Sequence, residues 1–416
     1  MSYVIGLRCV KCSKEFLSSS VDYYCPDCGY HEGILDVLYD YEKISRVLTK
    51  EKLQNDSNRS LWRYLPLLPI EQPELLSHLH VGWTPLYEVP RLASALGVQT
   101  CYVKDEGRNP TGSFKDRASS IGVIKAQEKK AERITCASTG NAASSLAGFA
   151  ASQGLPATIF VPQRAPEAKV AQLLIFGAQV FSVQGTYDQA WELCMEASRQ
   201  FGWYNRNCAI NPYLIEGKKT VSLEIAEQFF DQPAEKIPDW VVVAVGDGCT
   251  IAGVWKGFKE MHQLGLLQKV PKILGVQAEG CQPFVTAWKN KTDLQPCLEG
   301  DTLADSIAVG YPRNFYKGMQ AVLESCGAYV AVQDEDILRS MTTLARTAGV
   351  FGEPAGVAGV AGILKAKKLG FISSTDSVVL IVTGNGLKDI HSAIIATGST
   401  TKIEPTLEAV TAALKQ

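Results

Sequence analysis

The chain has 416 residues, of which 46% are hydrophobic and 20% are charged, and its formal net charge is −2. This length is enough for two or three domains, and the composition is that of a globular protein with a large core. The near-balanced charge offers no broad basic face for nucleic acid and no polybasic membrane anchor. The longest apolar runs, residues 240–245 and 378–382, have the length of strands and fall far short of the ~20 residues that cross a bilayer.

The first chemical signal in chain order is a set of cysteines near the N-terminus. Cys9 and Cys12 form one C-x2-C pair, Cys25 and Cys28 form another, and residues 13–24 separate them. Two such pairs at this spacing supply four thiolates to one tetrahedral zinc ion. A pair of disulfides is the alternative, but the other eight of the 12 cysteines are scattered along the chain, and free thiols beside a metal site point to a reducing cytoplasm. We therefore predict a structural zinc ribbon in a cytoplasmic protein.

Beyond these cysteines, strands alternate with helices. Residues 39–58 are charged and predict helix, and residues 63–70 predict an extended linker. Runs rich in β-branched residues predict strands at residues 100–104, 134–137, 157–161, 179–183, 240–245, 273–278, 329–332 and 378–382. Helical patterns fill the gaps, for example at residues 142–151, 167–176, 187–201, 251–261, 334–348 and 354–368. Because the strands are continuously apolar, we expect them to be buried on both faces of parallel sheets in an α/β fold.

One lysine in this pattern has an unusual position. Lys115 lies in a turn rich in Gly, Ser and Thr, shortly after the strand predicted at residues 100–104. Most lysines are solvated surface charges, but a lysine at a strand-to-helix turn can lose its hydration and become a nucleophilic amine. Such an amine forms a Schiff base with an aldehyde, and pyridoxal phosphate is the aldehyde cofactor whose ring serves amino-acid chemistry as an electron sink.

Similar turns follow three further strands. Residues 138–141, 246–250 and 383–386 each place small polar residues between a buried strand and a helix. The carboxyl ends of parallel strands are where α/β sheets bind ligands, and free backbone N–H groups at a helix start can hold an anion. Any one of these turns could be an ordinary helix cap. Together, with a lysine in the first of them, they favour an enzyme.

The order of these segments resembles the tryptophan-synthase-β-like pyridoxal-phosphate enzymes, and within that group it is most similar to the threonine synthase family. The similarity covers residues 82–389 and rests on SFKDR around Lys115, STGN ending at Asn141, the glycine loop at residues 246–250 and TGNG starting at Thr383. It implies two α/β domains built on open parallel sheets, with the cofactor in the cleft between them, and a homodimer. The implied units are a zinc ribbon at 1–36, a large cofactor-binding domain at 37–120 and 208–400, a small domain at 121–207, and a C-terminal helix at 401–416.

The resemblance also implies a function for each motif. Lys115 would hold the cofactor as a Schiff base and remove the Cα proton of an amino-acid substrate, Asn141 would hydrogen-bond the phenolic oxygen of the cofactor, and Thr383 would face its pyridine nitrogen. The turn before Asn141 would bind the substrate carboxylate, and the glycine loop would bind the cofactor phosphate. The residues implied are Ser138, Thr139 and Gly140 for the carboxylate, and Gly246, Asp247, Gly248, Cys249 and Thr250 for the phosphate.

The sequence departs from the family pattern where the leaving phosphate of O-phosphohomoserine would bind. Ala142 replaces a threonine, Leu214 replaces an arginine, and Lys218 replaces a glutamine, while Ala118 stands where glycine is usual. Losing two polar contacts to a phosphate could weaken its binding by about two decades. Lys218 could compensate as a point charge, which makes it a candidate substrate-binding residue.

Threonine synthase is therefore the favoured function, converting O-phosphohomoserine and water to threonine and phosphate. One alternative is a β-replacement or deaminating enzyme that acts on phosphoserine, acetylserine, serine or threonine through an aminoacrylate-type intermediate. Asp116 argues against a plain deaminase, because isoleucine follows the lysine in the dehydratases. The other alternative is an inactive binding module, which the intact Lys115, Asn141 and Thr383 disfavour.

Overall fold

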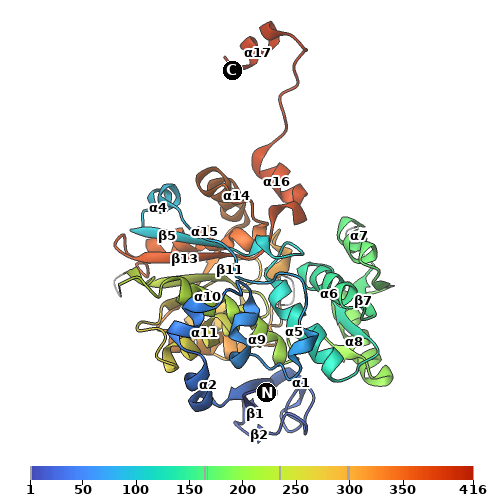
Figure 1. Cartoon of the computed structure of the whole chain (residues 1–416). Coiled ribbons are helices and arrows are strands. Elements are labelled where there is room, and N and C mark those ends of the chain that lie inside the picture. The colour runs from blue at the N-terminus through green and yellow to red at the C-terminus, as the bar shows by residue number, and fades with distance from the viewer. Residues whose placement is uncertain (1, 164, 166, 234–235, 298–299, 416) are drawn as a thin grey trace.

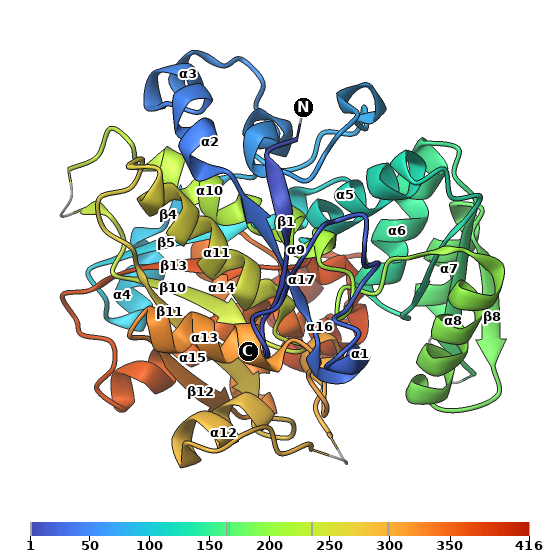
Figure 2. The same ribbon diagram turned by 90° about the horizontal axis from the view of Figure 1, so that it is seen from below.

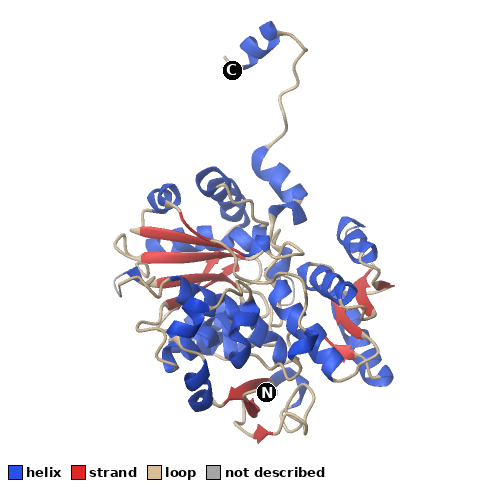
Figure 3. Ribbon diagram, in the orientation of Figure 1, coloured by secondary structure: helices blue, strands red, loops and turns tan. Residues whose placement is uncertain are grey.

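The computed structural model describes residues 2–163, 165, 167–233, 236–297 and 300–415, and it contains three sheets. Figures 1 and 3 show a small antiparallel sheet at the N-terminus, a six-stranded sheet wrapped by helices, and a four-stranded sheet at one side of it. Among the described residues, no helix is long and apolar enough to cross a membrane.

The N-terminal sheet has the order β2-β1-β3 and is antiparallel. It consists of β1 (Val4–Cys9), β2 (Glu15–Phe16) and β3 (Leu35–Tyr39), with a one-turn helix α1 (Gly29–Glu32) directly after the second cysteine pair. In the first pair, Cys9 is the last residue of β1 and Cys12 lies in the turn between β1 and β2. The strands therefore bring both cysteine pairs to one end of the sheet.

The segment that follows confirms one prediction and corrects another. Residues 39–58 form two short helices, α2 (Tyr41–Val47) and α3 (Lys50–Asn55), capped by Asp40 and Thr49. The expected extended linker is a buried 3-10 helix, η1 (Leu61–Leu67), in which Tyr64 is fully buried. The prediction there was wrong because the apolar side chains of this segment are buried in tertiary structure, which favours a compact turn over extended chain. A short 3-10 turn η2 (Pro73–Leu75) leads on to the larger sheets.

The six-stranded sheet has the order β12-β11-β10-β13-β5-β4, and only the edge strand β4 runs antiparallel. Its strands are β4 (Leu86–Glu88), β5 (Thr100–Asp105), β10 (Trp240–Ala244), β11 (Lys272–Ala278), β12 (Ala328–Val332) and β13 (Ser377–Val382). Alternate residues of β10 enter two separate cores: Val241 and Val243 pack with α11, and Trp240 and Val242 pack with α15. Burial on both faces confirms the prediction made from the continuous apolar runs.

Helices cover both faces of this sheet (Figure 2). One core includes residues of α10 (Thr220–Gln228), α11 (Cys249–Gln263), α12 (Pro283–Asn290) and α13 (Phe315–Glu324). The other includes residues of α4 (Pro90–Leu96), α14 (Asp334–Ala348) and α15 (Pro354–Lys368). The helix α5 (Lys115–Glu128) packs against α9 (Tyr213–Lys218) and against α6 of the smaller sheet.

The four-stranded sheet is entirely parallel, with the order β8-β7-β6-β9. Its elements are β6 (Ile134–Ala137), β7 (Ala157–Pro162), β8 (Gln179–Val183), β9 (Tyr204–Asn205), α6 (Asn141–Ser152), α7 (Glu167–Ile175) and α8 (Tyr187–Phe201). Local sequence fixes the ends of α8, because Thr186 and Gln189 form a capping box and Gly202 ends the helix with φ +68°.

The chain ends in an arm that points away from the rest of the molecule (Figure 1). After β13 come a 3-10 turn η6 (Gly386–Lys388), α16 (Ile390–Thr397) and α17 (Leu407–Ala413). The helix predicted within 401–416 is therefore present but shorter, and none of its residues is buried.

Candidate active site

A cavity of about 590 Å³ lies where the carboxyl ends of the two larger sheets face each other. Its walls include the residues that follow β6, β9, β10 and β13, which is the edge at which parallel sheets bind ligands. Every residue predicted for the cofactor or the substrate lines it: Lys115, Ser138, Thr139, Gly140, Asn141, Lys218, Gly246, Asp247, Gly248, Cys249, Thr250 and Thr383. The loop at residues 305–311 lines it as well.

Lys115 is the first residue of α5 and reaches the cavity wall. Loss of solvent around its amine lowers its pKa to about 8, and the neighbouring charges of Lys218 and Arg206 act in the same direction. A lysine with this pKa has roughly a tenth of its amine in the neutral, nucleophilic form at pH 7, far more than an ordinary lysine.

A buried ion network fixes the helix that holds this lysine. Arg117, two residues further along α5, donates to Glu106 over 2.7 Å and to both carboxylate oxygens of Glu224 over 2.5 and 2.7 Å. Lys104 of β5 lies 2.9 Å from the same Glu224. All these charged groups are fully buried, so the opposite charges must compensate one another. The network therefore ties the start of α5 to β5 and α10.

Asn141 and Glu353 form a pair on another wall. The Asn141 Nδ2 donates to Glu353 Oε1 over 2.6 Å. Glu353 is the residue before the first turn of α15, and its backbone N–H donates to the carbonyl of Gly384 over 3.1 Å. Burial raises the pKa of Glu353 to about 7, and the charge of Asp305 adds to the increase. The carbonyl of Thr383 accepts from the N–H of Phe114 over 2.9 Å, which joins the end of β13 to the turn of Lys115.

The loop after β10 has the properties of an anion site. Gly248 has φ +86°, and a Cβ there would lie 2.7 Å from the carbonyl of Asn314, so glycine is required. Helix α11 begins at Cys249, and among the described residues the backbone N–H groups of 246–251 have no hydrogen-bond acceptor. Unpaired N–H groups at the start of a helix of this length attract a phosphate or carboxylate.

Two buried cations lie beside this loop. Lys218 and Arg206 are each 2% exposed and line the cavity, and Arg206 also donates to Ser119 over 3.0 and 3.2 Å. Cys208 is a neighbour of these two cations and of Cys249. A hydrogen bond from Cys249 lowers the pKa of Cys208 well below its ordinary value. Burial raises this pKa, and the charges of Lys218 and Arg206 lower it further. The cavity is thus electropositive near the loop.

The departures from the family pattern have a structural counterpart. Leu214 is fully buried in α9 and does not line the cavity, whereas Ala142 does. A Cβ placed on Gly122 would touch both Leu214 and the stem of Arg206, so these two side chains are neighbours. Arg206, contributed by another segment, therefore lies next to the position at which the family pattern has an arginine.

Sequence reasoning missed two arginines of the cavity. Arg206 follows β9, whose two residues are too few to recognise as a strand, although β9 pairs with β6 and ends at the same edge. The rule that identified the turn after β6 would have found it. Arg313 lies in the loop before α13, where no local signal distinguishes it from a surface arginine.

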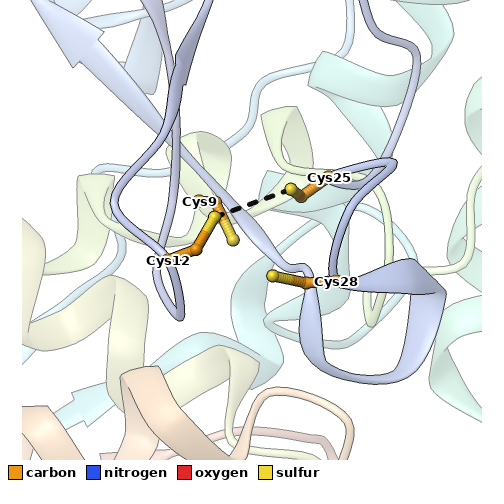
Figure 4. Close-up of side chains that lie close together, drawn as sticks. All are labelled: Cys9, Cys12, Cys25 and Cys28. Carbon is orange, nitrogen blue, oxygen red and sulfur yellow. Dashed lines mark hydrogen bonds between the residues drawn. The ribbon is translucent and has the colours of Figure 1, made fainter.

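The four N-terminal cysteines come together as predicted (Figure 4). Their sulfur atoms all lie within 4.8 Å of one another, and those of Cys12 and Cys25 are 3.8 Å apart. Four thiols converging from two tight turns make a donor set that suits a tetrahedral metal ion such as zinc.

Comparison with known proteins decides the family. The model of the family described as "Pyridoxal-phosphate dependent enzyme" matches residues 78–384. The chain is 38% identical to the threonine synthase of Methanocaldococcus jannaschii over 411 residues, which covers 98% of this chain and 99% of that protein. It is 40% identical to the threonine synthase of Methanosarcina acetivorans, with 98% of each chain covered.

The chain belongs to the threonine synthase family of pyridoxal-phosphate-dependent enzymes. The fold agrees: diaminopropionate ammonia lyase from Escherichia coli superimposes with a TM-score of 0.65 at 18% identity, covering 80% of this chain and 95% of that one. For a pyridoxal-phosphate-dependent enzyme of this family, the cavity offers a lysine of lowered pKa, a helix start whose N–H groups are unpaired among the described residues, and polar side chains.

Proposed function

We propose that the protein catalyses the conversion of O-phosphohomoserine and water to threonine and phosphate. The observation that carries the proposal is Lys115, whose amine has a pKa of about 8 and lies in a cavity lined by every motif of the family pattern. Relatives named threonine synthase that align along 98% of the chain support this reaction over the β-replacement and deamination alternatives.

Bound pyridoxal phosphate supplies an electron sink that stabilises negative charge at the substrate α-carbon. In this proposal Lys115 attaches the cofactor and later removes the Cα proton. Gly246, Asp247, Gly248, Cys249 and Thr250 hold the cofactor phosphate through the unpaired N–H groups of the loop. Thr383 faces the pyridine nitrogen as a neutral hydroxyl.

Asn141 binds the phenolic oxygen of the cofactor, and Glu353 orients its amide through the 2.6 Å hydrogen bond. Ser138, Thr139 and Gly140 hold the substrate carboxylate at the start of α6, where hydroxyls and backbone N–H groups are available. These groups fix the α-carbon near Lys115, which reduces the entropy lost when the proton is transferred.

Lys218 and Arg206 provide positive charge for the phosphate that leaves the substrate. Both are buried beside the glycine loop, where a charge-assisted hydrogen bond is stronger than in water. These two cations offset the missing arginine at position 214 and the missing hydroxyl at position 142. In this proposal the family therefore tolerates Leu214 and Ala142.

The N-terminal unit has a structural function in this proposal. Cys9, Cys12, Cys25 and Cys28 bind one zinc ion, which stabilises a segment too short to form its own core. The proposed units are the ribbon at 1–36, the large domain at 37–120 and 208–400, the small domain at 121–207, and the C-terminal helix within 401–416. We further propose a cytoplasmic homodimer.

The test is to supply the purified, cofactor-loaded protein with O-phosphohomoserine, and to measure phosphate release and identify the amino-acid product in the same sample. Equal amounts of phosphate and threonine are expected. Lys115→Ala should abolish both, while Lys129→Ala, at the exposed end of the same helix, should leave them unchanged. Cofactor-loaded protein that releases no phosphate would contradict the proposal.

A further inference from the structure

Arg313 is a partly exposed cation of the cavity wall. Its side chain is 12% exposed, whereas Arg206 and Lys218, which line the same cavity, are buried. Its backbone N–H donates to Asp247 Oδ1 over 2.7 Å, which links its loop to the glycine loop. Arg313 therefore lies beside the glycine loop and retains some contact with solvent.

The hydrogen-bonding capacity of this guanidinium is mostly unused. Its Nη2 lies 3.8 Å from Asp188, a residue whose side chain is 79% exposed, so that this ion pair is weak. Its Nε is buried and has no hydrogen-bond partner among the described residues. A guanidinium has five N–H donors in a planar fork that suits phosphate, so this one retains the capacity to bind a ligand anion.

Aromatic rings hold Arg313 in place, and they connect it to the N-terminal ribbon. The guanidinium carbon lies 4.1 Å from the ring centre of Trp191 on α8. Tyr30, in the helix after the second cysteine pair, stacks on the same Trp191 with ring centres 6.1 Å apart and planes at 29°. Next to it, His31 contacts Tyr311 with ring centres 5.7 Å apart. The ribbon thus packs against the wall of the cavity.

We propose that Arg313 binds the distal anionic group of the substrate, and that Tyr30 of the ribbon positions Arg313 through Trp191. The proposal rests on the proposed function, in which the substrate carries a phosphate at the end opposite its α-carboxylate. The α-carboxylate is bound at residues 138–140, so the distal phosphate needs a separate site. Arg313 completes that site with Lys218 and Arg206, and it selects against amino acids whose side chain is neutral.

The test compares two unreactive ligands that differ only in the distal anion. L-2-amino-5-phosphonopentanoate has the chain of L-norvaline with a phosphonate on its last carbon. Binding of each to the holoenzyme is followed by the change in the cofactor absorption spectrum. Arg313→Met should weaken phosphonate binding about 10- to 100-fold, the value of charge-assisted hydrogen bonds, and change norvaline binding less than about twofold. Arg313→Lys should restore part of the loss, and Arg339→Met, an exposed arginine of α14, should have no effect.

Tyr30→Ala tests the positioning by the ribbon. It should weaken phosphonate binding several-fold and raise KM for O-phosphohomoserine without changing kcat, and Tyr30→Phe should behave as wild type because the ring makes the contact. Equal losses for both ligands in Arg313→Met, or no loss for either, would overturn the proposal.

The outcome also separates this subsite from the reaction itself. Arg313-dependent phosphonate binding in a protein that does not turn over O-phosphohomoserine would support the subsite and contradict the proposed reaction. Normal turnover with an unchanged KM in Arg313→Met would support the reaction and overturn the subsite.

Discussion

The lowered pKa of Lys115 predicts how attachment of the cofactor depends on pH. Only the neutral amine attacks an aldehyde. With a pKa of about 8, about half of the amine is neutral at pH 8, against ~0.4% for a lysine of ordinary pKa near 10.4. Because the pKa is lowered, the rate of attachment should rise with pH until about pH 8 and then level off. At pH 8 it should be roughly 100-fold faster than for a solvated lysine of equal access.

The assay mixes apoprotein with saturating pyridoxal phosphate and follows its absorbance at a series of pH values. Lys218→Met removes a positive charge that lowers the pKa of Lys115, so the inflection should move to higher pH in this variant. Lys129→Met serves as the control, because Lys129 is exposed and pairs with Asp22. An inflection near the ordinary lysine pKa in the wild type, or one that Lys218→Met does not move, would refute the reasoning.

Three further predictions concern stability, metal and thiol chemistry. Arg117→Met leaves Glu106 and Glu224 buried without their main partner, and should lower the free energy of unfolding in urea by ~3–5 kcal/mol; a loss below about 1 kcal/mol would show that the network is not essential. Purified protein should contain one zinc ion per chain, and removal of the metal with a chelator should make residues 1–36 sensitive to protease. If the ribbon resists protease equally well with and without metal, the result would argue against a metal site. In the metal-loaded apoprotein, iodoacetamide should modify Cys208 first, because the hydrogen bond from Cys249 lowers its pKa; bound cofactor should slow the reaction, and labelling that starts at Cys297 or Cys326 would contradict this.

Most of the fold could be predicted because most of its strands correspond to short local runs of β-branched residues. The strands at residues 134–137 and 179–183 have the predicted bounds, since each is a short run of strand-forming residues between turns. Other strands differ from prediction by one residue at an end, as β10 does at Ala244. The misses have physical causes: β9 is only two residues long, and η1 is stabilised by burial in tertiary structure that its local sequence does not reveal.

The cavity shows the same division between local and distant signals. The residues of the four motif turns were predictable because each motif combines a strand, a turn and a helix start within a few residues. Arg206 was missed because β9 is too short to be recognised as a strand, and Arg313 was missed because its relation to the cavity arises only when distant segments meet. No sequence pattern predicts the contact of Tyr30 with Trp191, because it joins two distant segments, the ribbon and α8.

The central claim is that Lys115 is the residue that holds the cofactor, and chemical trapping tests it most directly. Holoprotein treated with borohydride, digested and analysed by mass spectrometry should contain one reduced pyridoxal-phosphate adduct, on the peptide that includes Lys115. Lys115→Ala should lose this adduct. An adduct on another buried lysine, such as Lys104, Lys218 or Lys219, or an adduct that persists in Lys115→Ala, would contradict the account.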